Sequence, residues 1–272
     1  MCQQFIYNKE IIMQQKYQLG FIGAGNMAKA IAKGIIKGGL LGADQILMTD
    51  LTKGNFEGIE ITDDNSEVFQ RCEYIVFAIK PQVFDAISST FSNIQAQAVI
   101  SIMAGISVQK IKSATGIDNV VRVMPNFPCM IGKGMAAIAI NECPQTINDF
   151  VLAVFNSVGK AIFLPETLFD AVTSISGSGP AYVYYFIQAM ANAGVEGGLS
   201  FQDSLQLTLQ TFEGAVKMVE QSDIPIDTMI DNVCSKGGTT IEAIKTFESQ
   251  GVDRAIKDGI RACKNRSEEL SK

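Results

Sequence analysis

The chain has 272 residues, of which 47% are hydrophobic and 18% charged, and its formal net charge is −6. This length accommodates one large domain or two smaller ones, and the composition is that of a globular protein rather than a disordered or membrane-spanning one. Because the acidic excess lies after residue 163 and no basic region stands out, we expect no nucleic-acid and no membrane partner.

The sequence contains no histidine, which excludes Ser-His-Asp triads, HExxH sites and histidine-zinc sites. Its six cysteines are scattered without a CxxC pair, so we predict neither a disulfide framework nor a metal site, and a reducing cytoplasm fits best. Any chemistry must therefore use carboxylates, hydroxyls, lysines, backbone amides or a bound cofactor.

Residues 1–16 are interpreted as an N-terminal extension before the first strand. Short apolar segments predict strands at 17–22, 46–49, 74–79, 98–102, 120–124 and 135–140. A helix is predicted over 26–37, with Gly38 and Gly39 supplying a left-handed cap. Strands that are apolar throughout and alternate with helices indicate a parallel sheet covered on both faces. Residues 17–163 are thus predicted to form a doubly wound, Rossmann-like α/β domain.

From Leu164 the apolar residues recur at helical spacing, as at Tyr182, Phe186 and Met190. Ser178 followed by Pro180 predicts a helix start, because proline is tolerated in the first turn. Residues 164–272 are predicted to form an all-α second domain, with the boundary near Pro165.

A GxGxxA fingerprint follows the first predicted strand, at residues 23–28. A helix follows it, and Asp50 ends the next strand, which is the context of a dinucleotide site rather than of a purely structural turn. Asp50 favours NADH, whereas Thr52 and Lys53 are alternative holders of a 2′-phosphate, so NADPH stays open. The predicted cofactor-binding residues are Gly23, Gly25, Asn26, Met27, Asp50, Ala78, Lys80 and Pro81.

The segment SKGGTT, residues 235–240, combines glycines with the start of a predicted helix. Glycines expose backbone N–H groups and a helix N-terminus attracts anions, so this segment suits a small carboxylate. The alternative is an ordinary serine or threonine N-cap with a glycine turn, and the two roles are compatible.

Three parts of the sequence together resemble the pyrroline-5-carboxylate reductase family: residues 19–30, residues 121–134, and residues 173–199 with 233–241. The resemblance runs from Tyr17 to about Arg266. It implies NAD(P)H-dependent reduction of 1-pyrroline-5-carboxylate to L-proline, the last step of proline biosynthesis. It also implies a homodimer interlocked through the helical domain, often in rings of dimers, with part of each active site at the interface.

The same resemblance implies roles for individual residues. Ser235 and the amides of Gly238, Thr239 and Thr240 hold the substrate carboxylate, and Thr240 hydrogen-bonds the ring nitrogen, with Thr240 and Ser235 as the catalytic candidates. Asn126 faces the nicotinamide or the substrate, although an Asn after Pro is also ordinary turn chemistry.

Two positions depart from the family's usual pattern. Lys236 stands where proline is usual, and Phe127 stands where threonine or another small residue is usual. These departures leave open a reductase of another cyclic imine or small carboxylate. A non-catalytic dinucleotide-binding regulator that has kept the fold is a third interpretation, and the intact SKGGTT segment argues against it.

Overall fold

The computed structural model describes residues 17–270, and contacts within it divide the chain into two compact units. The first unit contains the described residues up to Gly177 together with those from Lys264 onward, and the second is Ser178–Cys263. The expected extension at residues 1–16 lies outside the described residues.

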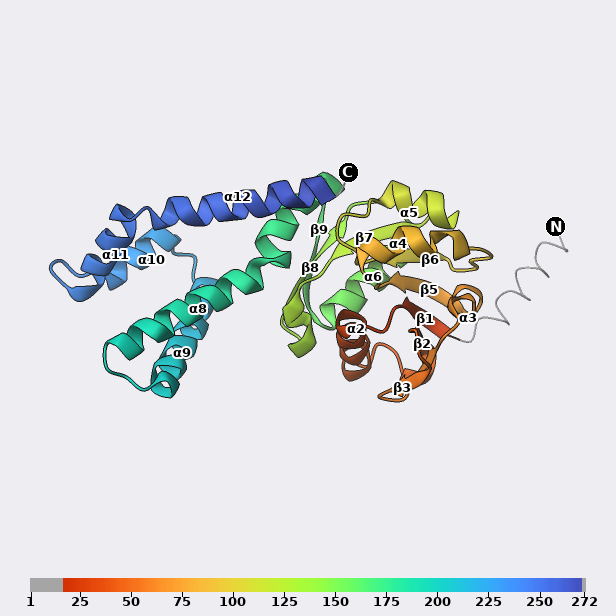
Figure 1. Cartoon of the computed structure of the whole chain (residues 1–272), viewed down its shortest axis with the longest axis horizontal. Coiled ribbons are helices and arrows are strands. Elements are labelled where there is room, and N and C mark those ends of the chain that lie inside the picture. Colours follow the sequence, from red (N-terminus) through yellow and green to blue (C-terminus); the bar gives the residue numbers. More distant parts are fainter. Residues whose placement is uncertain (1–16, 271–272) are drawn as a thin grey trace. The chain divides into compact units, whose positions relative to one another are not determined.

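The first unit is built on a sheet that has nine strands in the described part of the chain, in the order β3-β4-β2-β1-β5-β6-β7-β8-β9 (Figure 1). β1 lies between β2 and β5 and runs parallel to both, which is the arrangement of a doubly wound α/β domain. The predicted fold class is thereby confirmed. The strands are β1 (Tyr17–Ile22), β2 (Ile46–Thr49), β3 (Gly54–Phe56), β4 (Ile59–Thr62), β5 (Cys72–Phe77), β6 (Ala98–Ser101), β7 (Val120–Met124), β8 (Gly134–Ala139) and β9 (Gly159–Leu164).

The sheet departs from the prediction in three respects. β3 pairs antiparallel with β4, and β8 pairs antiparallel with β7, so the sheet is mixed rather than wholly parallel. β3, β4 and β9 were also not predicted. β5 begins at Cys72 rather than at Tyr74, because helix α3 runs directly into it without a connecting turn.

Helices cover both faces of this sheet (Figure 1). One buried cluster joins the sheet to α2 and α6, through residues such as Ile31 and Val151. A second cluster joins the other face to α3, α4 and α5, through residues such as Phe69, Phe84 and Ile111. The helices of this unit are α2 (Asn26–Lys37), α3 (Asn65–Arg71), α4 (Pro81–Ile87), α5 (Val108–Thr115), α6 (Gln145–Asn156) and α7 (Phe169–Val172), with short helical turns η1 (Ala43–Gln45), η2 (Ser88–Thr90), η3 (Phe127–Ile131), η4 (Glu166–Leu168) and the π-helical η5 (Thr173–Gly177).

Helix α2 has the predicted bounds, but its end differs in detail. Gly38 keeps a right-handed conformation with φ −77°, and the left-handed residue is Gly39 with φ +70°. Only the second glycine therefore uses the conformational freedom that the sequence suggested for the pair.

The second unit is helical, as predicted for this part of the chain. It contains α8 (Gly179–Glu196), α9 (Phe201–Glu220), α10 (Ile226–Val233), α11 (Thr239–Ser249) and most of α12 (Val252–Leu270). α8 begins at Gly179 with Pro180 in its first turn. It packs closely on α9, because a Cβ on Gly194 would lie only 2.0 Å from Ser204 Oγ. No helix of residues 17–270 is long and apolar enough to cross a membrane.

By contacts, the chain divides after Gly177 rather than after residue 163. The intervening residues pack on the sheet: Phe169 is buried against β8, and Arg122 of β7 pairs with Glu166 at 3.1 Å. The end of α12 joins them, since Ser267 Oγ donates to Asp170 Oδ1 at 2.6 Å. The helical spacing of apolar residues thus begins at Leu164, before the boundary between the two units. Such spacing shows that a segment is helical, but it does not show which unit the helix packs against.

Candidate active site

The connection between β1 and α2 requires a glycine at its first position. Gly23 has φ +97°, and a Cβ built on it would lie 3.0 Å from Ile79 Cγ2 and 3.1 Å from the Ala78 carbonyl oxygen. The Gly23 N–H donates to Thr49 Oγ1 at 3.3 Å. Thr49 is buried at the end of β2 and was missed by sequence reasoning; a hydroxyl ending an apolar strand was its only signal.

Gly25 is a different case, because nothing in the protein requires a glycine there. Its φ is −72°, and a Cβ would meet no atom within 4 Å. It is the N-cap of α2, and no side chain caps the helix, so no capping side chain occupies the first amides of α2, from Asn26 and Met27. An uncapped helix N-terminus behind an accessible glycine fits the pyrophosphate of a dinucleotide. Ala28, the last residue of the fingerprint, is fully buried, and a small residue there allows close packing of the helix on the strand.

Three segments that were predicted to bind the cofactor follow three neighbouring parallel strands. The glycine turn follows β1, Asp50 follows β2, and residues 78–81 follow β5. Their strands lie side by side, so the structure brings these residues to one edge of the sheet. Asp50 is exposed there and accepts a hydrogen bond from the Leu51 N–H at 2.7 Å. Lys80 is exposed, and Pro81 begins α4.

The side chain of Asn126 is engaged at both ends by the protein itself. Its Oδ1 accepts from the Met135 N–H at 2.8 Å, and its Nδ2 donates to the Ser176 carbonyl oxygen at 3.2 Å and to Ser176 Oγ at 3.3 Å. Gly177 follows, and a Cβ on it would lie 2.6 Å from Met124 Cε. Asn126 therefore braces the loop after β7 against η5, and the glycine serves close packing. Phe127 is 53% exposed.

In the second unit, residues 235–240 form a turn that leads into α11; we call them the substrate loop, after the role predicted for them from the sequence. The Gly238 N–H donates to the Ser235 carbonyl oxygen at 2.9 Å, and Gly237 has φ +72°. A positive φ at the third position of a turn is typical of type II geometry, in which proline is common at the second position but other residues are accepted. Lys236 occupies that second position, which explains how the turn forms without the usual proline.

The substrate loop places a hydroxyl beside an uncapped helix N-terminus. Gly238 is the N-cap of α11, and no side chain caps the helix. A Cβ on Gly238 would lie 2.3 Å from Ser235 Oγ, so the serine hydroxyl sits directly over this glycine. Thr239 and Thr240 are the first two residues of the helix, Thr239 exposed and Thr240 half-buried. The structure thus brings together all four residues predicted to hold the substrate carboxylate.

Comparison with known proteins connects both units to one kind of enzyme. The chain is 36% identical to the pyrroline-5-carboxylate reductase of Synechocystis, covering 94% of this chain and 98% of that protein. It is 35% identical to the Escherichia coli protein of the same name, again covering 94% of this chain and 98% of that protein. The chain belongs to the pyrroline-5-carboxylate reductase family.

Two family models and a solved structure agree with this membership. The model for pyrroline-5-carboxylate reductase dimerisation matches residues 166–270, and the model for NADP oxidoreductase, coenzyme F420-dependent, matches residues 18–105. The crystal structure of the Plasmodium falciparum reductase with NADP bound has a TM-score of 0.88 and 32% identity, covering 95% of this chain and all of that one. The reductase family thus includes both the α/β unit and the helical unit described above.

Proposed function

We propose that this protein reduces 1-pyrroline-5-carboxylate to L-proline with NADPH or NADH. The observation that carries the proposal is the substrate loop, in which a free helix N-terminus and the Ser235 hydroxyl converge on one point. A carboxylate fits there because the amides and the helix dipole neutralise its charge without burying it unpaired. In functional terms we assign dinucleotide binding to residues 17–163 and substrate binding and dimerisation to residues 164–272.

The reaction adds a hydride to the imine carbon and a proton to the ring nitrogen. The nicotinamide supplies the hydride when the cofactor is bound. The glycine turn and the N-terminus of α2 hold the pyrophosphate, with Asp50 and residues 78–81 around the remainder of the dinucleotide. The amides of Gly238 and Thr239, together with Ser235, orient the substrate through its carboxylate.

We assign Thr240 to the ring nitrogen. The first turn of α11 presents its hydroxyl on the same helix end that holds the carboxylate, and a hydroxyl donates to a nitrogen whose basicity rises as the hydride adds. Since the sequence has no histidine, a hydroxyl or a water molecule is the available proton route. Asn126 acts mainly on the loop after β7, because its side chain is bonded to Met135 and Ser176.

The decisive assay follows NADH and NADPH oxidation with pyrroline-5-carboxylate. Thr240→Val, which keeps the shape but removes the hydroxyl, is expected to lower kcat by about 10- to 100-fold, and Thr240→Ser to restore most of it. Thr239→Val is the matched control, because Thr239 is assigned only through its backbone amide. Unchanged turnover in Thr240→Val would reject the assigned role, and dinucleotide binding without turnover of any cyclic imine would favour the regulator.

Phe127 and Lys236 support a second substrate hypothesis. Phe127 is largely exposed in η3, and Lys236 adds a cation to the substrate loop. A panel of cyclic imine carboxylates of different ring size separates this hypothesis from the first. A higher kcat/KM for a substrate with another ring size would show that this substrate, and not pyrroline-5-carboxylate, is the preferred one.

We propose further that the protein is a homodimer formed through its helical unit. Apolar side chains on α8 and α9 are exposed within the single chain, among them Tyr184 at 56%, Tyr185 at 71% and Leu207 at 59%. Large apolar side chains exposed in such number on two packed helices favour an interaction surface. Light scattering of the purified protein, with Tyr185→Asp as the variant expected to dissociate it, tests the dimer and also measures any larger ring.

A cytoplasmic location is proposed from the cysteines. The five that lie in residues 17–270 are free thiols, and Cys72 and Cys129 are buried. Free thiols are typical of proteins from reducing compartments. Fractionation of cells that express the protein tests this assignment.

A further inference from the structure

The cofactor edge of the sheet carries a group of carboxylates beyond β2. β4 lies beside β2 and parallel to it, and the Asp50 N–H donates to the Thr62 carbonyl oxygen at 3.0 Å. Asp63 and Asp64 follow β4 immediately, so they lie beside Asp50 at the ends of neighbouring strands. Three carboxylates therefore gather where the second strand of a dinucleotide fold meets the adenosine ribose.

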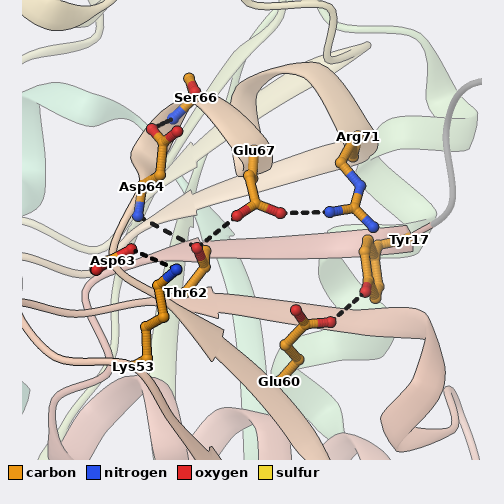
Figure 2. Close-up of polar contacts among 9 residues, drawn as sticks. All are labelled: Tyr17, Lys53, Glu60, Thr62, Asp63, Asp64, Ser66, Glu67 and Arg71. Atoms are coloured by element: carbon orange, nitrogen blue, oxygen red, sulfur yellow. Dashed lines mark hydrogen bonds and ion pairs between the residues drawn. The ribbon is translucent and has the colours of Figure 1, made fainter.

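Asp63 and Asp64 make polar contacts with neighbouring residues (Figure 2). Asp64 caps α3 by accepting from the Ser66 N–H at 2.8 Å, and its own N–H donates to Thr62 Oγ1 at 3.3 Å. The hydrogen bonds from Ser66 hold the pKa of Asp64 below its ordinary value. Glu67 is engaged behind them, where it accepts from Thr62 Oγ1 and pairs with Arg71.

Lys53 is the basic residue of this loop, and it faces a carboxylate. Its Nζ lies 3.2 Å from Asp63 Oδ1 (Figure 2). Two lysines on the neighbouring helix α2 also have partners: Lys29 lies over the Phe56 ring at 5.5 Å, and Lys33 pairs with Glu57 at 2.6 Å. These three lysines are thus already directed to groups of the protein.

We infer that this reductase prefers NADH to NADPH, with Asp50 and Asp63 as the residues that determine the preference. The Asp50 carboxylate accepts hydrogen bonds from ribose hydroxyls and repels a 2′-phosphate, whose charge is about −2. Asp63 holds Lys53, the side chain best placed to compensate that phosphate. The Plasmodium relative crystallised with NADP shows that the fold admits the phosphate, so the preference belongs to these side chains and not to the fold.

The inference rests on the proposed dinucleotide site, and its test is equilibrium binding of NAD⁺ and NADP⁺ by calorimetry at low salt. The unmodified protein is expected to bind NAD⁺ at least about tenfold more tightly than NADP⁺. Asp50→Ser should shift the ratio of the two dissociation constants by at least about tenfold toward NADP⁺, since it removes both the hydrogen-bond acceptor and the repulsion. Asp63→Asn should strengthen NADP⁺ binding several-fold and leave NAD⁺ binding unchanged, because it releases Lys53.

Asp118→Asn is the matched control. Asp118 is exposed and precedes β7, so it lies at the opposite end of the parallel strands from the cofactor site. The substitution removes one carboxylate there and should leave the ratio of the two dissociation constants unchanged. Equal or tighter binding of NADP⁺ by the unmodified protein would overturn the inference, as would an unshifted ratio in both Asp50→Ser and Asp63→Asn. The binding measurement needs no imine substrate, so it tests this inference separately from the proposed reaction. Tighter binding of NAD⁺ without proline formation would refute only the proposed substrate. Proline formation with tighter binding of NADP⁺ would refute only this inference.

Discussion

Replacing Gly25 by alanine separates cofactor binding from folding. The residue has φ −72°, and the added methyl group meets no protein atom within 4 Å. Alanine is a poorer N-cap than glycine by about 0.5–1 kcal/mol, but it also restricts the unfolded chain by about 0.4–1 kcal/mol, so the two effects largely cancel. The free energy of unfolding is therefore expected to change by less than about 0.5 kcal/mol.

Dinucleotide binding by Gly25→Ala should fall much more than its stability. The methyl group would stand in front of the α2 amides, where the pyrophosphate must approach the backbone. A loss of at least tenfold in affinity corresponds to about 1.4 kcal/mol. Calorimetric titration with NAD⁺ and urea unfolding at one fixed protein concentration measure the two quantities separately.

Two other glycines give the contrasting outcomes. Gly23→Ala forces a side chain into φ +97° beside Ile79 and Ala78, which should cost about 1–3 kcal/mol of stability as well as binding. Gly116→Ala places alanine at φ +70° in open space after α5, so it should lower stability alone. Equal destabilisation by Gly25→Ala and Gly23→Ala, or unaltered NAD⁺ affinity in Gly25→Ala, would refute this account of the turn.

Two further predictions concern the interior of the first unit. Glu166→Ala leaves the buried Arg122 guanidinium without its carboxylate and should lower the free energy of unfolding, measured in urea, by about 2–4 kcal/mol. Arg122→Met should cost less, because Glu166 is one-third exposed and still accepts a hydrogen bond from the Val108 N–H. A larger loss of stability in Arg122→Met would contradict this reasoning. Burial raises the pKa of the Cys72 thiol to about 12, so Cys72 should resist thiol reagents at pH 8 until the protein unfolds. Because the pKa of Cys72 is raised in the folded state, the thiol contributes stability that is fully present below the unfolded pKa near 8.5 and is lost as pH rises toward 12. The stability of Cys72→Ala should therefore depend less on alkaline pH than that of the unmodified protein. Identical pH profiles for the two proteins would count against this assignment.

The strands that sequence reasoning located are those buried on both faces. β1, β2 and β7 have the predicted bounds, because a short, mostly apolar run is the signature of a central strand. β3 and β9 form the two edges of the sheet and are partly exposed, so they lack that signature. β4 is short and carries the exposed Glu60 among its apolar residues.

The candidate site was predictable where backbone geometry determines it. The turn at Gly23, the turn at residues 235–240 and the helix starts that follow them were predicted, because turns and helix starts have local sequence signals. The bonds of Asn126 were not predictable, since its partner Ser176 lies far along the chain and meets it only after folding. Lys53 likewise was an open alternative until the ends of β2 and β4 were found side by side.

The division of the chain has a consequence for its synthesis. The second unit is inserted into the first, and its two ends meet where Cys263 Sγ donates to Ser178 Oγ at 3.3 Å. Ser267 then returns to Asp170 in the first unit. Chains fold from the N-terminus as they leave the ribosome, yet here the α/β unit lacks part of its packing until residues 264–270 have emerged. We therefore expect a nascent chain of this reductase to carry an incompletely packed nucleotide-binding unit, with apolar surface exposed to aggregation, throughout translation of its helical insert.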